Sequence, residues 1–241
     1  MTALLGGGGV AWLAAQGADS RIMVIKVSVV LGAWMVLGVL KVTDLAERGW
    51  MKVAVVFVFV GNMFSIWMRE LTVYGVTLNV VAGLVMMATV ALPRTVRVDQ
   101  TPRRQVFYGL TLPWILLYTL WDINVLLIIK SIGSEARDGI FGGSGVAQIL
   151  GTVLACRFRP ERYLEARIHI MSLYILCASL EPISSRMLRT PGWNTPEVTL
   201  PLHVAALAVA IWVVVRSIRR ALRGEAPQNP VELAIQRIRR S

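Results

Sequence analysis

Long apolar stretches separated by short polar gaps dominate the chain. Seven of these stretches are expected to form helices, over about 22–41, 53–69, 73–93, 106–129, 139–156, 168–187 and 199–219. A helix needs about 20 apolar residues to cross the hydrocarbon core of a bilayer. Because backbone polar groups must be paired within the chain there, continuous runs of this length favour helices over short alternating barrel strands. The pattern predicts an all-α integral membrane protein, built as a bundle of seven transmembrane helices.

The two ends of the chain depart from this pattern. Residues 1–21 form an apolar, glycine-rich segment without the basic start of a signal peptide, interpreted as a surface or re-entrant segment, with an additional span as the alternative. Residues 224–241 are interpreted as a linker and a basic amphipathic helix, with Asn229 as N-cap and Pro230 at the first helical position. A frayed tail is the alternative. The predicted domains are 1–21, 22–223 and 224–241.

Composition and charge agree with a membrane location. Apolar residues make up 56% of the 241 residues and charged residues only 16%, against about 45–50% and about 25% in soluble domains. The net charge of +11 raises the question of nucleic acid. However, the basic residues lie in the gaps between apolar runs and at the C-terminus. They are therefore interpreted as topology signals, and the expected partners are the bilayer and anionic lipid, with no nucleic acid.

The basic residues also predict an orientation. Gaps and tail on one side of the predicted bundle carry 18 of the 25 Lys and Arg residues, and the opposite side carries 7. Loops rich in Lys and Arg stay in the cytoplasm. The C-terminus is therefore expected in the cytoplasm and the N-terminus outside, in a multi-pass protein of a bacterial-type plasma membrane. A model with six or eight spans would move only one end.

Polar side chains inside the predicted spans gather in the outer half of the bundle. Ionisable residues at such depth are costly, and each suggests a function. The set predicted to form an outward-facing pocket for a ligand or ion is Asp122, Glu181, Asn62, Asn79, Asn124, Tyr118, Gln148, His203 and Arg69. Asp122 and Glu181 would form its acidic centre, with Arg69 at the rim. The alternative is hydrogen bonding between helices, which contributes about 0.6–2 kcal/mol per contact.

The fifth predicted span carries small residues every four positions. They are Gly139, Gly143, Ala147, Gly151 and Ala155. Such a stripe allows close approach of a second helix. It is interpreted as packing inside the bundle, with a contact to a second copy or to a partner membrane subunit as the alternative.

Several chemistries find little support in the sequence. Cys156 and Cys177 lie in apolar runs, and there are two histidines, so no metal site or cofactor is expected. The sequence contains no HExxH or GxSxG motif, so no catalytic residues are assigned. Asp122 and Glu181 are nevertheless of the residue type that can act as general acid and general base. Transport of a solute or ion is the leading hypothesis. A seven-helix sensor, an accessory subunit and, less favoured, an intramembrane enzyme are the alternatives.

Three short motifs resemble a bacterial membrane protein family of unknown function. The run 117–124 (LYTLWDIN) is similar to the aromatic-rich "LWN" span of that family, and 163–167 (YLEAR) and Asn229-Pro230 are similar too. The resemblance covers about residues 70–241 and implies a multi-span inner-membrane protein. The family has Asn where this chain has Asp122, so carboxylate chemistry at 122 is not implied by the resemblance.

Overall fold

The computed structural model describes residues 18–128, 139, 141–178, 180, 183, 186–187 and 189–241. Seven long helices account for most of them: α2 (Ala18–Val42), α3 (Gly49–Arg69), α4 (Thr77–Ala88), α5 (Leu112–Ile128), α6 (Gly142–Ala155), α7 (Tyr163–Ala178) and α9 (Pro196–Leu222). Each of the seven predicted segments contains most of one of these helices. The prediction of a mostly helical fold is therefore confirmed, and the glycine-rich segment 1–17 lies outside the described residues.

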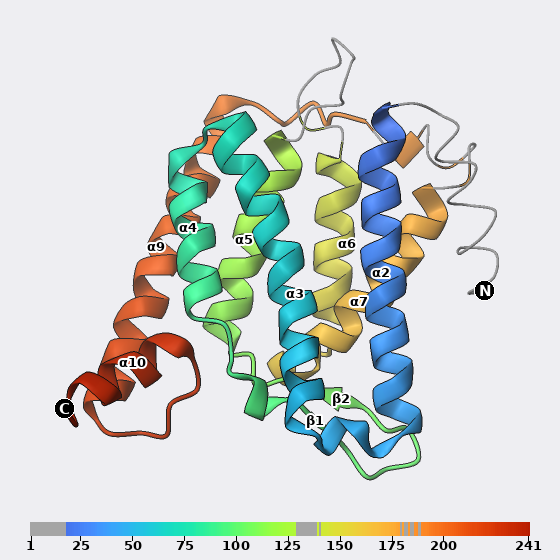
Figure 1. The fold of residues 1–241 in the computed structure, drawn as a ribbon. Coiled ribbons are helices and arrows are strands. Elements are labelled where there is room, and N and C mark those ends of the chain that lie inside the picture. The colour runs from blue at the N-terminus through green and yellow to red at the C-terminus, as the bar shows by residue number, and fades with distance from the viewer. Residues whose placement is uncertain are drawn as a thin grey trace.

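The helices run side by side, up and down, in one bundle (Figure 1). Helix α5 contacts α4, α6 and α9, while α2 contacts α3 and α7. Eleven of the 17 residues of α5 are buried, so α5 is the central helix of the bundle. Helices α4, α6 and α9 thus pack against it from several sides, and a polar residue on α5 can contact side chains from more than one helix.

Short elements close the lower end of the bundle in Figure 1. They are the 3-10 helices η2 (Asp44–Glu47), η4 (Pro93–Thr95) and η5 (Pro160–Arg162), and the antiparallel hairpin of β1 (Arg97–Val98) and β2 (Val106–Phe107). The fourth apolar stretch was expected to be helical from 106. The structure corrects this, because 106 and 107 pair with β1 and the helix begins only at Leu112.

The predicted C-terminal helix is present as α10 (Pro230–Ile238). The Asn229 side chain accepts a hydrogen bond from the Glu232 N–H at 2.9 Å, and the Glu232 carboxylate accepts one from the Gln228 N–H at 2.7 Å. This reciprocal arrangement is a variant of the capping box. Helix α10 packs against the lower end of α9, and its exposed Ile238 lies near the C-terminus.

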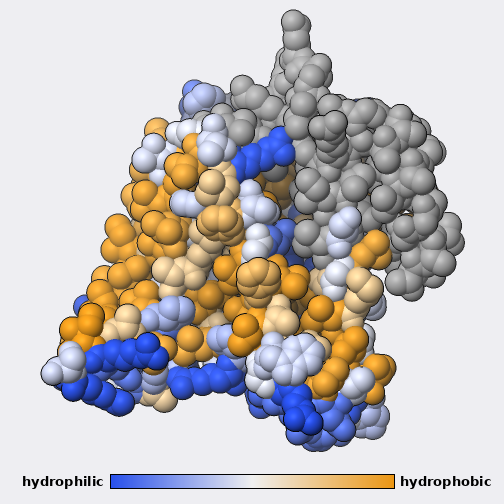
Figure 2. Space-filling model, in the orientation of Figure 1, coloured by the Kyte–Doolittle hydropathy of each residue, from blue (hydrophilic) through white to orange (hydrophobic). Residues whose placement is uncertain are grey.

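Among the described residues, two helices are long and apolar enough to cross a membrane by themselves, over Gly49–Thr72 and Pro196–Leu222. Only 28% and 22% of their most apolar 18-residue stretches are buried, whereas the core helix of a soluble protein is mostly buried. Helix α4 has 12 residues and rises about 18 Å, short of the ~30 Å hydrocarbon core. Figure 2 shows apolar side chains over the flanks of the bundle and hydrophilic ones along its lower end.

Candidate functional site

Helix α5 carries two buried polar groups on different faces. Tyr118 and Asp122 are four residues apart and therefore lie on one face, whereas Asn124 points to another. The exposed fraction is 5% for the Asp122 residue and zero for Asn124. Each of the two residues organises a separate cluster, one with α6 and α7 and the other with α3, α4 and α9.

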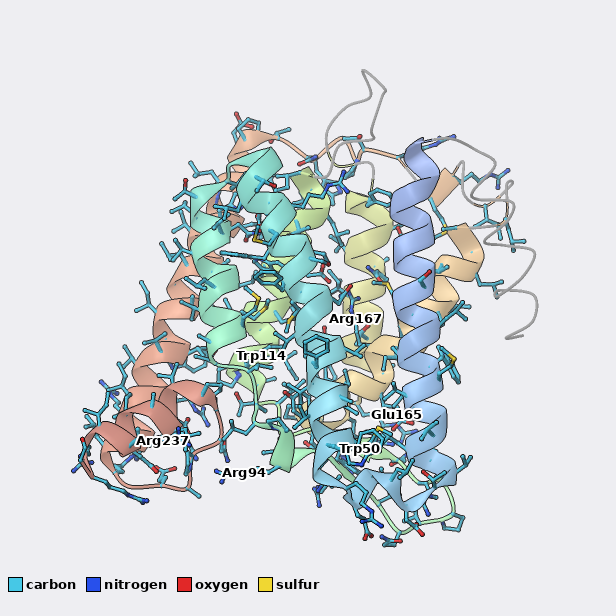
Figure 3. The ribbon with its side chains drawn as sticks, in the orientation of Figure 1. Trp50, Arg94, Trp114, Glu165, Arg167 and Arg237 are labelled. Carbon is cyan, nitrogen blue, oxygen red and sulfur yellow. The ribbon has the colours of Figure 1, made fainter. Side chains whose placement is uncertain are left out.

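The first cluster, the Asp122–Arg167 centre, consists of Asp122, Arg167, Gln148 and Tyr118. Arg167 Nη2 donates to Asp122 Oδ2, and Arg167 Nη1 donates to Gln148 Oε1 at 3.1 Å. The Arg167 guanidinium also lies 5.7 Å from the centroid of the Tyr118 ring, within cation–π range. An ion pair, an amide and an aromatic face thus hold one guanidinium inside the bundle (Figure 3).

Arg167 corrects an assumption made from the sequence. It was counted among the basic residues of the cytoplasmic gaps, but it lies in α7 with 6% of its surface exposed. Helix α7 begins at Tyr163, five residues before the predicted span, so Arg167 is carried one turn into the bundle. The sequence offered one indication of this burial. A carboxylate inside an apolar run, such as Asp122, needs a cation nearby when it is buried.

The second cluster, the Glu70–Asn79–Asn124 cluster, lies toward the upper end of the bundle. Asn79 Nδ2 donates to Glu70 Oε1 at 2.5 Å and to the Trp121 carbonyl at 3.3 Å. Asn124 Nδ2 donates to Asn79 Oδ1 at 3.0 Å and to the Leu202 carbonyl at 3.3 Å. Glu70, which is 1% exposed, was not among the predicted pocket residues.

Local backbone geometry explains why Glu70 turns inward. It begins η3 (Glu70–Tyr74), a π-helical turn that follows α3 and ends at Gly75 with φ +67°. Left-handed φ values suit glycine, which has no Cβ. A π-helical turn widens the helix and shifts its side chains relative to a regular helix, and such turns are frequent at functional sites. The sequence signal was weak, because Glu70 stood in a three-residue gap between two apolar runs.

A cavity of about 80 Å³ lies between α2, α3, α5 and α7 beside the Asp122–Arg167 centre. Its polar lining residues are Asn62, Tyr118 and Arg167. The remaining lining residues are aliphatic or aromatic: Val30, Ala33, Val36, Leu37, Leu40, Val55, Val58, Phe59, Leu164, Ile168 and Met171. The cavity is therefore mainly apolar, with one arginine, one amide and one phenol in its lining.

The predicted pocket residues are thus divided between three places. Asp122, Gln148 and Tyr118 meet at Arg167, while Asn79 bonds to both Glu70 and Asn124. Asn62 lines the cavity. His203 is buried, with 7% of its surface exposed, and it follows Leu202, whose carbonyl accepts a hydrogen bond from Asn124. Arg69 is half-buried at the end of α3, and Glu181 lies outside the described residues.

The small residues of the fifth predicted span lie on more than one side of α6. Ala147 and Ala155 are exposed, and an added Cβ at Gly151 would meet only Ile170, at 3.8 Å. Close approach to α5 is made by Gly145, where an added Cβ would lie 2.4 Å from Leu126 Cδ1, and by Gly139, where it would lie 2.4 Å from the Leu127 carbonyl oxygen. Gly139 has φ +81°, which favours glycine.

A third charged group sits at the lower end of α7. Glu165 Oε1 pairs with Lys41 Nζ, and Glu165 Oε2 accepts a hydrogen bond from the Val106 N–H at 2.7 Å. Burial acts to raise the pKa of the Glu165 carboxyl. Hydrogen bonds from His169 and Lys41 and from the Val106 N–H outweigh burial and hold that pKa at about 2. This group ties α2, α7 and the hairpin together below Arg167 (Figure 3).

Among the described residues no three His, Cys, Asp or Glu side chains are grouped to hold a metal ion. No family model, curated protein or solved structure matches the chain.

Proposed function

We propose that this chain is a seven-span membrane protein that moves a small solute, and that the solute occupies the cavity beside the Asp122–Arg167 centre. The N-terminus would face outward, and the C-terminus and basic loops would face the cytoplasm and its anionic lipid. The exposed apolar flanks of α3 and α9 support this assignment, because soluble proteins rarely leave apolar patches of such extent uncovered.

One observation carries the proposal of a transport site. Burying an ion pair removes the hydration of both charges, and this cost can exceed the energy of their Coulomb attraction. A buried ion pair therefore adds little stability compared with apolar side chains of similar size. Charged residues at membrane depth most often mark substrate or ion pathways. Here Arg167 of the ion pair also lines a cavity, so a solute in that cavity would contact this arginine.

The cavity suggests the kind of solute. Its walls are mainly apolar, and Asn62 and Arg167 in its lining carry hydrogen-bond donors. A small molecule with an apolar body and one acceptor group would satisfy both. Arg167 already binds Asp122 and Gln148, so a solute that takes over one of these contacts would loosen α7 from α5 or α6. Exchange of partners at Arg167 would thereby couple solute binding to helix movement.

The experiment is a thiol-accessibility test in cells, in a background with Cys156→Ala and Cys177→Ala. The test variant is Asn62→Cys, inside the cavity. Phe57→Cys is its matched control on the same helix, because Phe57 is 75% exposed on the apolar flank. A membrane-impermeant thiol reagent is added first to intact cells and then to permeabilised cells. The proposal expects Asn62→Cys to react from at least one side and Phe57→Cys to react from neither.

Two further variants test the topology in the same experiment. Glu197→Cys, at the exposed start of α9, should react in intact cells. Thr101→Cys, at the exposed hairpin, should react only after permeabilisation. If both controls react as expected but Asn62→Cys reacts from neither side, the transport proposal is wrong. The sealed bundle would then favour a sensor or an accessory subunit.

A further inference from the structure

A hollow of about 640 Å³ lies at the lower end of the bundle in Figure 1, apart from the cavity in the bundle. We call this end the loop face. The hollow is formed by the β1–β2 hairpin and the turn between α6 and α7. Three arginines line it: Arg103 from the hairpin, Arg157 from the end of α6 and Arg162 from η5. Thr101 and Gln105 add a hydroxyl and an amide to the lining. We call this hollow the arginine basin.

The three arginines of the basin have no carboxylate partner among the described residues, in contrast to Lys41 and Arg220 of the same face. Lys41 pairs with Glu165, and Arg220 pairs with Glu225 at 2.7 Å. In the part of the chain that the structure describes, no ion pair involves Arg103, Arg157 or Arg162.

Asp99 does not neutralise the basin, although it lines it. Its Oδ1 accepts hydrogen bonds from Thr101 Oγ1 at 2.9 Å and from the Gln105 N–H at 2.8 Å, and it is therefore engaged in holding the hairpin turn. Three guanidinium groups against one engaged carboxylate leave an excess of positive charge in one hollow. Like charges held close together repel, and a bound anion would offset that repulsion.

The backbone around the basin is unusual as well. Among the described residues, the non-glycine positions with positive φ are Arg104 at 42°, Arg157 at 53° and Phe158 at 56°. Arg157 lines the basin, and the other two are chain neighbours of lining residues. Side chains disfavour this region, and residues held in it cluster at ligand-binding sites. Two separate loops with this conformation thus contribute arginines to the lining of one hollow.

We propose that the arginine basin binds a phosphate group, carried by a soluble small molecule or by a lipid headgroup. The planar guanidinium donates two parallel hydrogen bonds and matches phosphate oxygens. A phosphate monoester carries up to two charges and three acceptor oxygens, which suits three arginines better than a single carboxylate does. The volume is within the range of small-molecule sites. The inference concerns the loop face alone and does not depend on transport.

The experiment measures binding of inorganic pyrophosphate to the purified full chain in a neutral detergent, by calorimetry. The test variant is Arg157→Gln/Arg162→Gln. Its matched control is Arg48→Gln, an exposed arginine of the same loop face that does not line the basin. Each charge-assisted contact contributes about tenfold or more, so the double variant should bind about 100-fold more weakly while the control binds as the parent does.

Three results are decisive. Loss of binding in the double variant alone, with an unchanged melting temperature without ligand, supports the basin. Equal weakening in the control and the double variant would mean general charge attraction and would overturn the proposal, as would no binding to the parent chain. The same titration in nanodiscs with and without phosphatidylglycerol separates the two sources, because occupancy by a lipid headgroup would abolish pyrophosphate binding only in the presence of that lipid.

Discussion

Two carboxylates are buried in the described part of the bundle, Asp122 and Glu70, and they are held by different means. Asp122 pairs with a guanidinium that is itself bound by an amide and lies beside an aromatic ring. Glu70 is held by the Asn79 amide, and its Oε2 has no hydrogen-bond partner among the described residues. The first carboxylate is compensated by charge and the second by hydrogen bonding. Removing a partner should therefore cost much more at the first than at the second.

The largest expected effect is at Arg167. Arg167→Met removes the cation and leaves Asp122 and Gln148 buried without their donor. Breaking a buried pair in this way costs about 3–5 kcal/mol. We expect that loss in the free energy of unfolding, measured by denaturant titration in mixed micelles, while Arg216→Met, at an exposed position, changes it by less than about 0.5 kcal/mol.

A double variant sharpens this prediction. Asp122→Leu together with Arg167→Met replaces the ion pair by apolar side chains, and such replacements are often neutral. The double variant should recover most of the stability lost in Arg167→Met. If it is as unstable as the single variant, the cost arises from packing around Arg167 and not from an uncompensated charge.

The next effect concerns the packing between α4 and α5, where the second cluster is assembled. An added Cβ at Gly83 would lie 2.6 Å from Trp121 Nε1 and 2.7 Å from Trp67 Cδ1. Two rings cannot shift as easily as a flexible side chain, so Gly83→Ala should destabilise by about 1–3 kcal/mol. Gly61→Ala is the control, because nothing lies within 4 Å of its added Cβ. There alanine should stabilise the helix by up to about 1 kcal/mol.

A smaller effect, which depends on pH, is expected at Glu165. Like Asp122, Glu165 pairs with a cation, but its side chain is more exposed. Its pKa is lowered from 4.5 to about 2 in the folded chain. A lowered carboxyl pKa stabilises the fold above the unfolded value, and that contribution is lost as the pH falls through the folded value. Stability should therefore decline between about pH 4.5 and about pH 2. A melting curve of Glu165→Gln measured over the same range should show a weaker decline than the parent chain.

The smallest effect is expected at Glu70. Glu70→Gln keeps an acceptor oxygen for Asn79 and changes only the oxygen that has no partner. We expect a change in the free energy of unfolding below about 1 kcal/mol, within the range of a single hydrogen bond. A loss as large as that of Arg167→Met would show that Glu70 is held by charge, and the contrast between the two clusters would be lost.

The helix positions could be predicted from the sequence because they depend on local pattern. Apolar runs of nearly constant length place α2, α3, α6 and α9 within a few residues of where they were expected. The C-terminal helix followed from Asn229 and Pro230, since capping is decided within one turn. Asn79, Asn124 and Gln148 were named as polar residues inside apolar runs and predicted to line a pocket, and the structure buries all three.

What the sequence determined about this protein is thus a set of helices and the polar residues that they bury. Only the tertiary structure decided how those residues pair. Asp122 meets Arg167 across 45 positions and Asn124 meets Asn79 across another 45, and such contacts depend on which helices pack together. A periodic pattern fixes which face of a helix is polar, but the neighbour of that face depends on the packing of every other helix. For the same reason the inward turn at Glu70 and the burial of Arg167 could be found only in the folded chain.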